Sequence, residues 1–254
     1  MLQPRVIPVL LFQNDSIVKT RKFSKPEYIG DPINTVNLYN DFEVDELIIL
    51  DIDASHSRNK INYTLIERMC AETFMPLTYG GGINSLQEMK FIFKLGIEKV
   101  VLGKSAYFNK ELIRSAADTY GCQAIVASVD YRKSLFNKYN AYVYNGNIKV
   151  RMPIEEYIEL LISQGCGEIL LNAIDRDGMM NGYDCEFVKK ISENVSVPVI
   201  ALGGAQSRTC IPKIINYSGA SAAAASSIFI YQNQEKGVLI NFPEKEEIID
   251  LLKE

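Results

Sequence analysis

Clusters of glycine and serine that directly follow short apolar runs are the residues of this sequence best suited to chemistry. They are Gly81, Gly82, Gly103, Lys104 and Ser105 in the first half, and Asp177, Gly178, Gly203, Gly204, Ser226 and Ser227 in the second. Glycine lets the backbone approach an oxyanion closely, and a helix that starts there directs N–H groups at the anion. A single Gly-Gly pair is also typical of a tight turn, but copies in both halves favour phosphate binding.

The two halves of the chain repeat at a fixed offset. Residues 46–53, 76–82 and 105 match residues 168–175, 198–204 and 227, and the members of every pair are 122 residues apart. Three matches at one offset indicate duplication of a half-domain, with halves at about 1–121 and 122–254 of a single domain. A duplicated phosphate site predicts a ligand with two phosphates, or one of similar span.

Short apolar, β-branched runs alternate with helical patterns along the chain. The expected strands are residues 6–11, 47–52, 76–79, 100–103, 124–129, 169–173, 198–202 and 222–225. The expected helices include residues 32–42, 65–73, 86–95, 110–119, 154–163, 186–193 and 243–252. This alternation implies parallel pairing, and eight such units favour a (β/α)8 TIM barrel over an open doubly wound sheet. The glycine and serine clusters then share the carboxyl-end face of the barrel.

Two segments at that face are longer than a usual connection. Residues 12–30 follow the first strand, and residues 131–152 follow the fifth. In the second segment, Asn145-Gly146 between β-rich runs predicts a tight hairpin. Long loops on the catalytic face of a barrel usually bind or cover a ligand.

Composition excludes several classes of protein. A formal charge of −4, from 27 basic and 31 acidic residues, argues against a general nucleic-acid binder. No apolar run suits a membrane span or signal peptide, so we expect a cytoplasmic protein. Five widely spaced cysteines argue against a disulfide framework or zinc site, and the one histidine, His56, is more typical of a loop residue than of a catalyst. We expect neither a metal nor a cofactor.

The motifs together resemble the cyclase subunit of imidazole glycerol phosphate synthase over nearly the whole chain. The resemblance is carried by Arg5-Val-Ile-Pro-Val-Leu10, Val18-Lys19, Gly30-Asp31-Pro32, Asp45-Glu46-Leu47, Gly80-Gly-Gly-Ile83, Gly167-Glu-Ile-Leu-Leu171, Ile174-Asp-Arg-Asp-Gly178 and Gly203-Gly-Ala205. It implies a barrel of two half-barrels, a ligand with two phosphates, and a glutaminase partner whose ammonia travels through the barrel. Lys19 and Lys104 are expected to add positive charge near the ligand, although Lys104-Ser105 departs from the family's Asn-Thr.

The chemistry of that family needs two opposed aspartates, which move protons during ammonia addition and ring closure. Asp130, after the fifth strand, matches one of them, whereas Leu11 stands at the end of the first strand in place of the other. Leucine transfers no proton, and loss of a general acid–base typically costs about 10²–10⁴ in rate. Asp51, at the end of the second strand, is either a further acid or a structural hydrogen-bonding residue.

The amino-end face of the barrel keeps the pattern of the family. Its ammonia entrance is a salt-bridged ring of two bases and two acids, and the matching residues are Arg5, Glu46, Lys99 and Glu168. Each lies at the start of an apolar strand, so the four side chains can meet and neutralise one another. Charged residues are common at strand starts, but a match at all four positions favours a retained ammonia gate.

A retained gate with one acid lost predicts an ammonia-conducting barrel that no longer closes an imidazole ring. The Leu10-Leu11 pair, Gly30-Asp31-Pro32-Ile33-Asn34 and Asp51-Ile-Asp-Ala-Ser55 also resemble a branch of the family associated with bacterial surface-polysaccharide and lipopolysaccharide O-antigen biosynthesis. There, ammonia is thought to pass to a sugar amidotransferase that makes acetamidino groups. The expected partners are a class I glutaminase at the amino-end face, a sugar amidotransferase and a phosphorylated small molecule, with no nucleic acid and no membrane.

Two other interpretations stay open. The chain is a working cyclase-lyase of histidine biosynthesis if Asp130 suffices alone or acts with Asp51. A phosphate-ligand-binding or isomerase barrel of the sister histidine-pathway type is the third possibility. That isomerase also uses two strand-end acids, and the four charged residues of the gate have no role in it.

Overall fold

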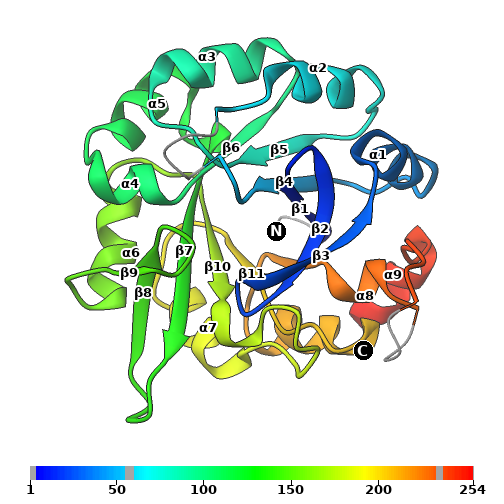
Figure 1. The fold of residues 1–254 in the computed structure, drawn as a ribbon. Coiled ribbons are helices and arrows are strands. Elements are labelled where there is room, and N and C mark those ends of the chain that lie inside the picture. Colours follow the sequence, from blue (N-terminus) through cyan, green and yellow to red (C-terminus); the bar gives the residue numbers. More distant parts are fainter. Residues whose placement is uncertain (1–3, 55–59, 233–236, 254) are drawn as a thin grey trace.

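The computed structural model describes residues 4–54, 60–232 and 237–253, and its central feature is a closed barrel of parallel strands ringed by helices (Figure 1). In order around the barrel, the strands are β1 (Arg5–Gln13), β4 (Leu47–Asp51), β5 (Leu77–Gly80), β6 (Lys99–Leu102), β7 (Ile125–Lys133), β10 (Glu168–Ala173), β11 (Val199–Leu202) and β12 (Ala222–Ala225). The barrel closes because β1 pairs in parallel with both β12 and β4. The predicted (β/α)8 barrel is confirmed.

Helices connect the strands and cover the outside of the barrel. They are α1 (Pro32–Asp41), α2 (Tyr63–Ala71), α3 (Leu86–Lys94), α4 (Lys104–Phe108), α5 (Leu112–Tyr120), α6 (Ile154–Ser163), α7 (Cys185–Ser192), α8 (Ser227–Ile230) and α9 (Lys245–Lys253). Every helix expected from the sequence is present. The short helices α4 and α8, and a π-helical turn at Lys213–Tyr217, are additional, because segments of four or five residues are too short for a periodic pattern.

The two long segments are largely strands, so the expectation of a loop was wrong for residues 12–30, whereas the β-rich runs expected on both sides of Asn145-Gly146 are present as strands. After β1, the chain forms β2 (Ser16–Arg21) and β3 (Ser24–Gly30), which pair antiparallel. Likewise β7 continues beyond the barrel and pairs antiparallel with β8 (Tyr139–Val143), which pairs with β9 (Ile148–Lys149). The predicted tight turn at Asn145-Gly146 joins β8 to β9. Where a strand extends beyond the parallel barrel, the chain that follows it turns back and pairs with it as an antiparallel strand.

Side chains alternate between the interior of the barrel and the layer of helices. The interior is filled by aliphatic residues and alanines, which are Ile7, Val9, Ile48, Val101, Val126, Leu170, Ile200, Leu202, Ala222 and Ala224. A larger apolar cluster packs the outer strand faces against the helices. On four of the strands, the residue two positions before an interior residue is charged. These residues are Arg5, Glu46, Lys99 and Glu168, and they lie at the amino ends of the strands. In the other direction, the residues two positions after an interior residue lie at the carboxyl ends of the strands, which form the mouth of the barrel. They include Leu11, Ser128 and Asn172.

In the described part of the chain, no helix combines the length and the apolar character needed to cross a membrane. His56 lies outside the described residues.

Candidate functional site

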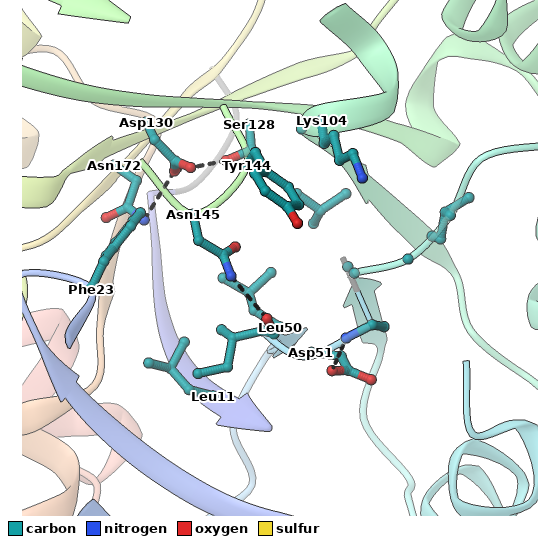
Figure 2. A pocket seen from close by; sticks show the side chains of 18 of the residues that line it. Leu11, Phe23, Leu50, Asp51, Lys104, Ser128, Asp130, Tyr144, Asn145 and Asn172 are labelled. Carbon is teal, nitrogen blue, oxygen red and sulfur yellow. Dashed lines mark hydrogen bonds between the residues drawn. The ribbon is translucent and has the colours of Figure 1, made fainter. Parts of the chain in front are cut away.

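A cavity of about 440 Å³ lies at the carboxyl ends of the barrel strands (Figure 2). Its lining includes most of the residues that the sequence predicts for the site, namely Leu11, Lys19, Asp51, Gly81, Gly82, Gly103, Lys104, Ser105, Asp130, Asp177 and Ser226. The other predicted phosphate-binding residues, Gly178, Gly203, Gly204 and Ser227, line an adjoining cleft of about 20 Å³. That cleft has room for about one water molecule. The two predicted anion sites are therefore unequal in size.

Asp130 lies on β7, close to the point where that strand leaves the barrel and enters the hairpin with β8. Ser128 and Asn172 each donate a hydrogen bond to its Oδ1 atom at 3.3 Å (Figure 2). Burial raises the pKa of Asp130 to about 7, the two hydrogen bonds oppose the rise, and the nearby charge of Asp177 adds to it. An acid with a pKa near neutrality both gives and takes a proton readily, which suits general acid–base chemistry.

Leu11 contributes an apolar surface to the same cavity. Its side chain is 8% exposed, and its strand neighbours are Leu50 on β4 and Val18 on β2. Because β1 and β7 are the first and fifth strands of an eight-stranded barrel, Leu11 and Asp130 belong to opposite sides of the mouth. Figure 2 shows Leu11 beside Leu50, away from Asp130. The wall opposite the acid therefore supplies no proton-transferring group at the Leu11 position.

Asp51 is tied into the turn that follows β4. Its carboxylate accepts hydrogen bonds from the backbone N–H groups of Asp53 and Ala54, both at 2.9 Å, and from the Tyr79 hydroxyl at 3.3 Å. Burial raises the pKa of Asp51, and the three hydrogen bonds oppose that rise. These contacts give Asp51 a structural role at the edge of the cavity.

Gly81 illustrates why the first glycine cluster has to be glycine. Its φ of +118° lies in a region that other residues rarely adopt, and a Cβ there would overlap the carbonyl oxygen of Asp51. The ends of β4 and β5 are therefore in close backbone contact. At this part of the cavity wall, backbone atoms rather than a side chain therefore face the cavity.

Asp177 holds the β2–β3 hairpin beside the small cleft through three contacts. The Lys19 ammonium lies 2.6 Å from its Oδ1 atom, and the Thr20 hydroxyl and Phe23 N–H donate to its Oδ2 atom at 2.7 and 3.3 Å. The Lys19 side chain is buried, so this charged pair is well shielded from water. A carboxylate repels phosphate, so any contribution of Asp177 to phosphate binding must act through Lys19.

Several residues that line the cavity were not predicted as site residues from the sequence. Asn172 is one of them, and it stands next to Asp130 across the β7–β10 pairing. Its Oδ1 atom and the Ser226 hydroxyl are buried and have no hydrogen-bond partner within the described residues. The sequence does carry a signal for Asn172, which is a lone asparagine in the apolar run Glu168–Ala173. A polar side chain buried in a parallel strand needs a hydrogen-bond partner, so its presence there points to a site.

The turn between β8 and β9 also reaches the cavity. Tyr144 and Asn145 line it, and the Asn145 side chain donates a hydrogen bond at 3.0 Å to the carbonyl of Ile52, beyond the end of β4. The Lys104 ammonium lies 4.5 Å from the centre of the Tyr144 ring. The turn belongs to the second half of the chain, and it thus crosses the mouth to contact the first half (Figure 2). Only the tertiary fold brings it there, so no local pattern predicts these contacts.

The four charged residues predicted as a gate meet at the amino end of the barrel. Arg5 lies 2.7 Å from both Glu46 and Glu168, and Lys99 lies 3.3 Å from Glu46 and 3.2 Å from Glu168. Thr78 donates a further hydrogen bond to Glu46 at 2.9 Å. Two positive and two negative charges alternate around the ring, so each carboxylate is shared between two cations. The ring lies beneath the apolar interior of the barrel.

Replacement of Asp130 by asparagine tests the raised pKa. The folded protein binds this proton more tightly than the unfolded chain, so the wild type loses stability as the pH rises from about 4 to about 7. Asp130→Asn removes the carboxyl group and with it this loss of stability at higher pH. We expect its stability relative to the wild type to increase between pH 4 and pH 8 by up to about 4 kcal/mol, and by less where water hydrates the carboxylate. Urea unfolding across this range measures the difference, with the exposed Asp118→Asn as control. A difference independent of pH would contradict the prediction.

Replacement of Asp177 by asparagine tests the closure of the small cleft. The variant loses the ion pair with Lys19, and a hydrogen bond to a charged group is worth about 1.5–3 kcal/mol. We expect trypsin to cut after Arg21 and Lys22 at least about tenfold faster, since the hairpin opens more often. Asp175→Asn is the matched control, because the Asp175 carboxylate accepts its hydrogen bond from the Lys133 N–H of β7 rather than from the β2–β3 hairpin. Equal cleavage rates in both variants would refute this role of Asp177.

Comparison with known proteins identifies the family. Residues 5–235 match the family model described as "Histidine biosynthesis protein". A protein of Leptospira interrogans, provisionally named as imidazole glycerol phosphate synthase subunit HisF, is 43% identical over 97% of this chain and 98% of its own length. A Pseudomonas aeruginosa protein, provisionally named as subunit hisF2, is also 43% identical, over 96% of this chain and 97% of its own. The Bacillus cereus protein named imidazole glycerol phosphate synthase subunit HisF is 37% identical over 91% of this chain and 92% of its own. The chain therefore belongs to the histidine biosynthesis protein family, as a HisF-like member.

Proposed function

We propose that this protein is the ammonia-conducting subunit of a glutamine amidotransferase complex and that it no longer closes an imidazole ring. A glutaminase releases ammonia at the amino-end face, and the barrel carries it to the opposite mouth. The observation that supports this most is the combination of an intact ring of Arg5, Glu46, Lys99 and Glu168 with Leu11 at the mouth. The parts needed to admit ammonia are kept, while one of two expected proton-transferring groups is missing.

The ring is suited to open at Lys99. The two contacts of Lys99 are 3.2 and 3.3 Å long, whereas both contacts of Arg5 are 2.7 Å and involve different nitrogen atoms. A lysine ammonium is a single point of attachment on a flexible stem, whereas a guanidinium holds two carboxylates in fixed geometry. Movement of Lys99 therefore opens a path while Arg5 keeps Glu46 and Glu168 in place.

The interior above the ring selects for neutral ammonia. It is lined by aliphatic residues and alanines, and it ends at the cavity beside Leu11 and Leu50. Transfer of an ammonium ion into such surroundings carries a large desolvation cost, whereas neutral ammonia is small and uncharged. The barrel thus supports passage of ammonia in the form that can act as a nucleophile.

The proposed acceptor is a surface-glycan sugar, to which a separate amidotransferase adds the ammonia in forming an acetamidino group. This part of the proposal follows the resemblance of Gly30-Asp31-Pro32-Ile33-Asn34 and the Leu10-Leu11 pair to the surface-polysaccharide branch of the family. A phosphorylated small molecule is proposed to bind in the cavity, contacted by backbone at Gly81 and by Lys104. The complex acts in the cytoplasm, where glutamine and nucleotide-activated sugars are both available.

A working cyclase is the second candidate function, and one observation favours it. Asp51 lines the same cavity as Asp130, and the pKa of Asp130 lies near neutrality. Asp51 would then replace the missing acid. Its three hydrogen bonds to Asp53, Ala54 and Tyr79 weigh against this role, because a proton-transferring carboxylate must be free to contact substrate.

Phe74 provides a test of the glutaminase partner. It lies in the connection between α2 and β5, at the amino-end face, and is 93% exposed. Buried aromatic anchors dominate many protein interfaces, so we expect Phe74→Asp to weaken glutaminase binding at least about 30-fold, corresponding to about 2 kcal/mol. Titration calorimetry measures the binding, and glutamine hydrolysis should lose its stimulation in parallel. Phe91→Asp on the outside of α3 is the control. Failure of the wild-type barrel to bind or stimulate the glutaminase would overturn the proposal.

Complementation separates the two candidate functions. In a histidine auxotroph that lacks its cyclase, we expect no growth from the wild-type chain together with its glutaminase, because Leu11 transfers no proton. Leu11→Asp restores an acid opposite Asp130, and we expect slow growth from it. Leu11→Asn, which has a similar shape but no acid, is the control. Growth supported by the wild type would favour the working cyclase. Growth supported by both Leu11→Asp and Leu11→Asn would show that an acid at this position is not what restores activity.

A further inference from the structure

The hairpin between β7 and β8 carries an exposed apolar tip. Leu135 is 100% exposed and Phe136 is 86% exposed, in a turn closed by hydrogen bonds from Ser134 N–H to Lys138 at 2.8 Å and from Asn137 N–H to Ser134 at 3.0 Å. In Figure 1 this hairpin extends well beyond the ring of helices. These adjacent Leu and Phe side chains, at the end of a projecting arm, are not used to pack the described part of the chain.

The charge around this tip differs from that of the rest of the protein. Residues 131–154 contain no aspartate or glutamate, and their cations are Arg132, Lys133, Lys138, Lys149 and Arg151. The whole chain, in contrast, has a formal charge of −4. An apolar tip on a cationic arm is complementary to an apolar pocket bordered by carboxylates.

The arm is held firmly to the barrel. The Tyr139 ring stacks on Phe187 of α7 with 3.8 Å between ring centres, and the Lys133 N–H donates to Asp175 at 3.0 Å. Arg132 and Lys133 lie over the rings of Tyr142 and Tyr139 at 5.0 and 5.5 Å. A preorganised arm loses little conformational entropy when a partner binds it.

The arm is also continuous with the cavity. Its strand β7 carries Asp130, which pairs in register with Tyr142 of β8, and the following turn places Tyr144 and Asn145 in the cavity wall. A protein held by this arm would therefore stand beside the mouth from which ammonia leaves, on the face opposite the four-charge ring.

We propose that the β7–β8 arm is the docking element for the amidotransferase that receives the ammonia, with Leu135 and Phe136 inserted in an acid-rimmed apolar pocket of that enzyme. The inference rests on the proposed function, because an ammonia-conducting barrel needs an acceptor enzyme at its mouth. A protein fits this arm better than a membrane does. The cations are spread along the arm rather than gathered at its tip, two of them lie over tyrosine rings, and a lipid surface accepts no ammonia.

The test uses the purified complex of this chain with its glutaminase and the sugar amidotransferase of the same organism. Biolayer interferometry measures binding of the amidotransferase to wild-type complex and to Leu135→Ser/Phe136→Ser. We expect the double variant to bind at least about 30-fold more weakly, while its glutaminase binding and thermal unfolding stay unchanged. Leu38→Ser/Phe91→Ser is the matched control, because it removes an exposed Leu and Phe from α1 and α3 and should bind like the wild type. Lys133→Glu/Lys138→Glu should weaken binding and reduce its dependence on salt.

A transfer assay separates failure of this inference from failure of the proposed function. With [amide-15N]glutamine and excess unlabelled ammonium, a channelled reaction places 15N in the sugar product. Transfer by the wild type that is lost in Leu135→Ser/Phe136→Ser, but not in the control, supports the docking role. Transfer that is equal in all variants overturns the docking role and leaves the proposed function standing. No 15N transfer by the wild type overturns the proposed function. Wild-type binding to vesicles of phosphatidylcholine and phosphatidylglycerol that the double variant loses, without amidotransferase binding, overturns the docking role in favour of a membrane.

Discussion

The pairing of β1 with β12, which closes the barrel, is the constraint on which the rest of the structure depends. Once the sheet is closed, every second side chain of each strand points into one shared interior. On β1 these are Arg5, Ile7, Val9 and Leu11, so a single strand contributes to the ring, the apolar interior and the mouth. The three layers are therefore fixed relative to one another. A change at the mouth, such as leucine in place of an acid, leaves the ring below it undisturbed.

The closed barrel explains which features could be predicted from the sequence. Strands buried on both sides are continuous apolar runs, and charges that precede them, such as Glu46 and Glu168, can be placed at one end by counting alone. The β2–β3 and β7–β8 hairpins escaped prediction because β3 is mostly exposed and β8 only partly buried, so neither is a continuous apolar run like the strands of the barrel. Asn172 escaped because its significance depends on its neighbour Asp130 across the β7–β10 pairing, not on any residue nearby in the sequence.

The two predicted anion sites show how a repeated sequence can give unequal sites. The glycines of both halves lie at strand ends, as the offset of the repeat requires. The glycines of the first half line the large cavity, whereas those of the second half line the small cleft, beside the Lys19–Asp177 ion pair. A phosphate entering the second site would compete with Asp177 for Lys19.

The position of Leu11 also determines what Asp130 can still do. A second carboxylate across the mouth would raise the pKa of Asp130 by repulsion and would draw water into the cavity, whereas leucine does neither. The pKa near 7 is due first to burial, so it does not need a second acid. Asp130 can accept a proton from an incoming nucleophile or return one, whereas the cyclisation that the family resemblance implies uses two opposed acids. Leu11 leaves an apolar surface at the position of the second acid, and the proposed ammonia-conducting role rests on that loss.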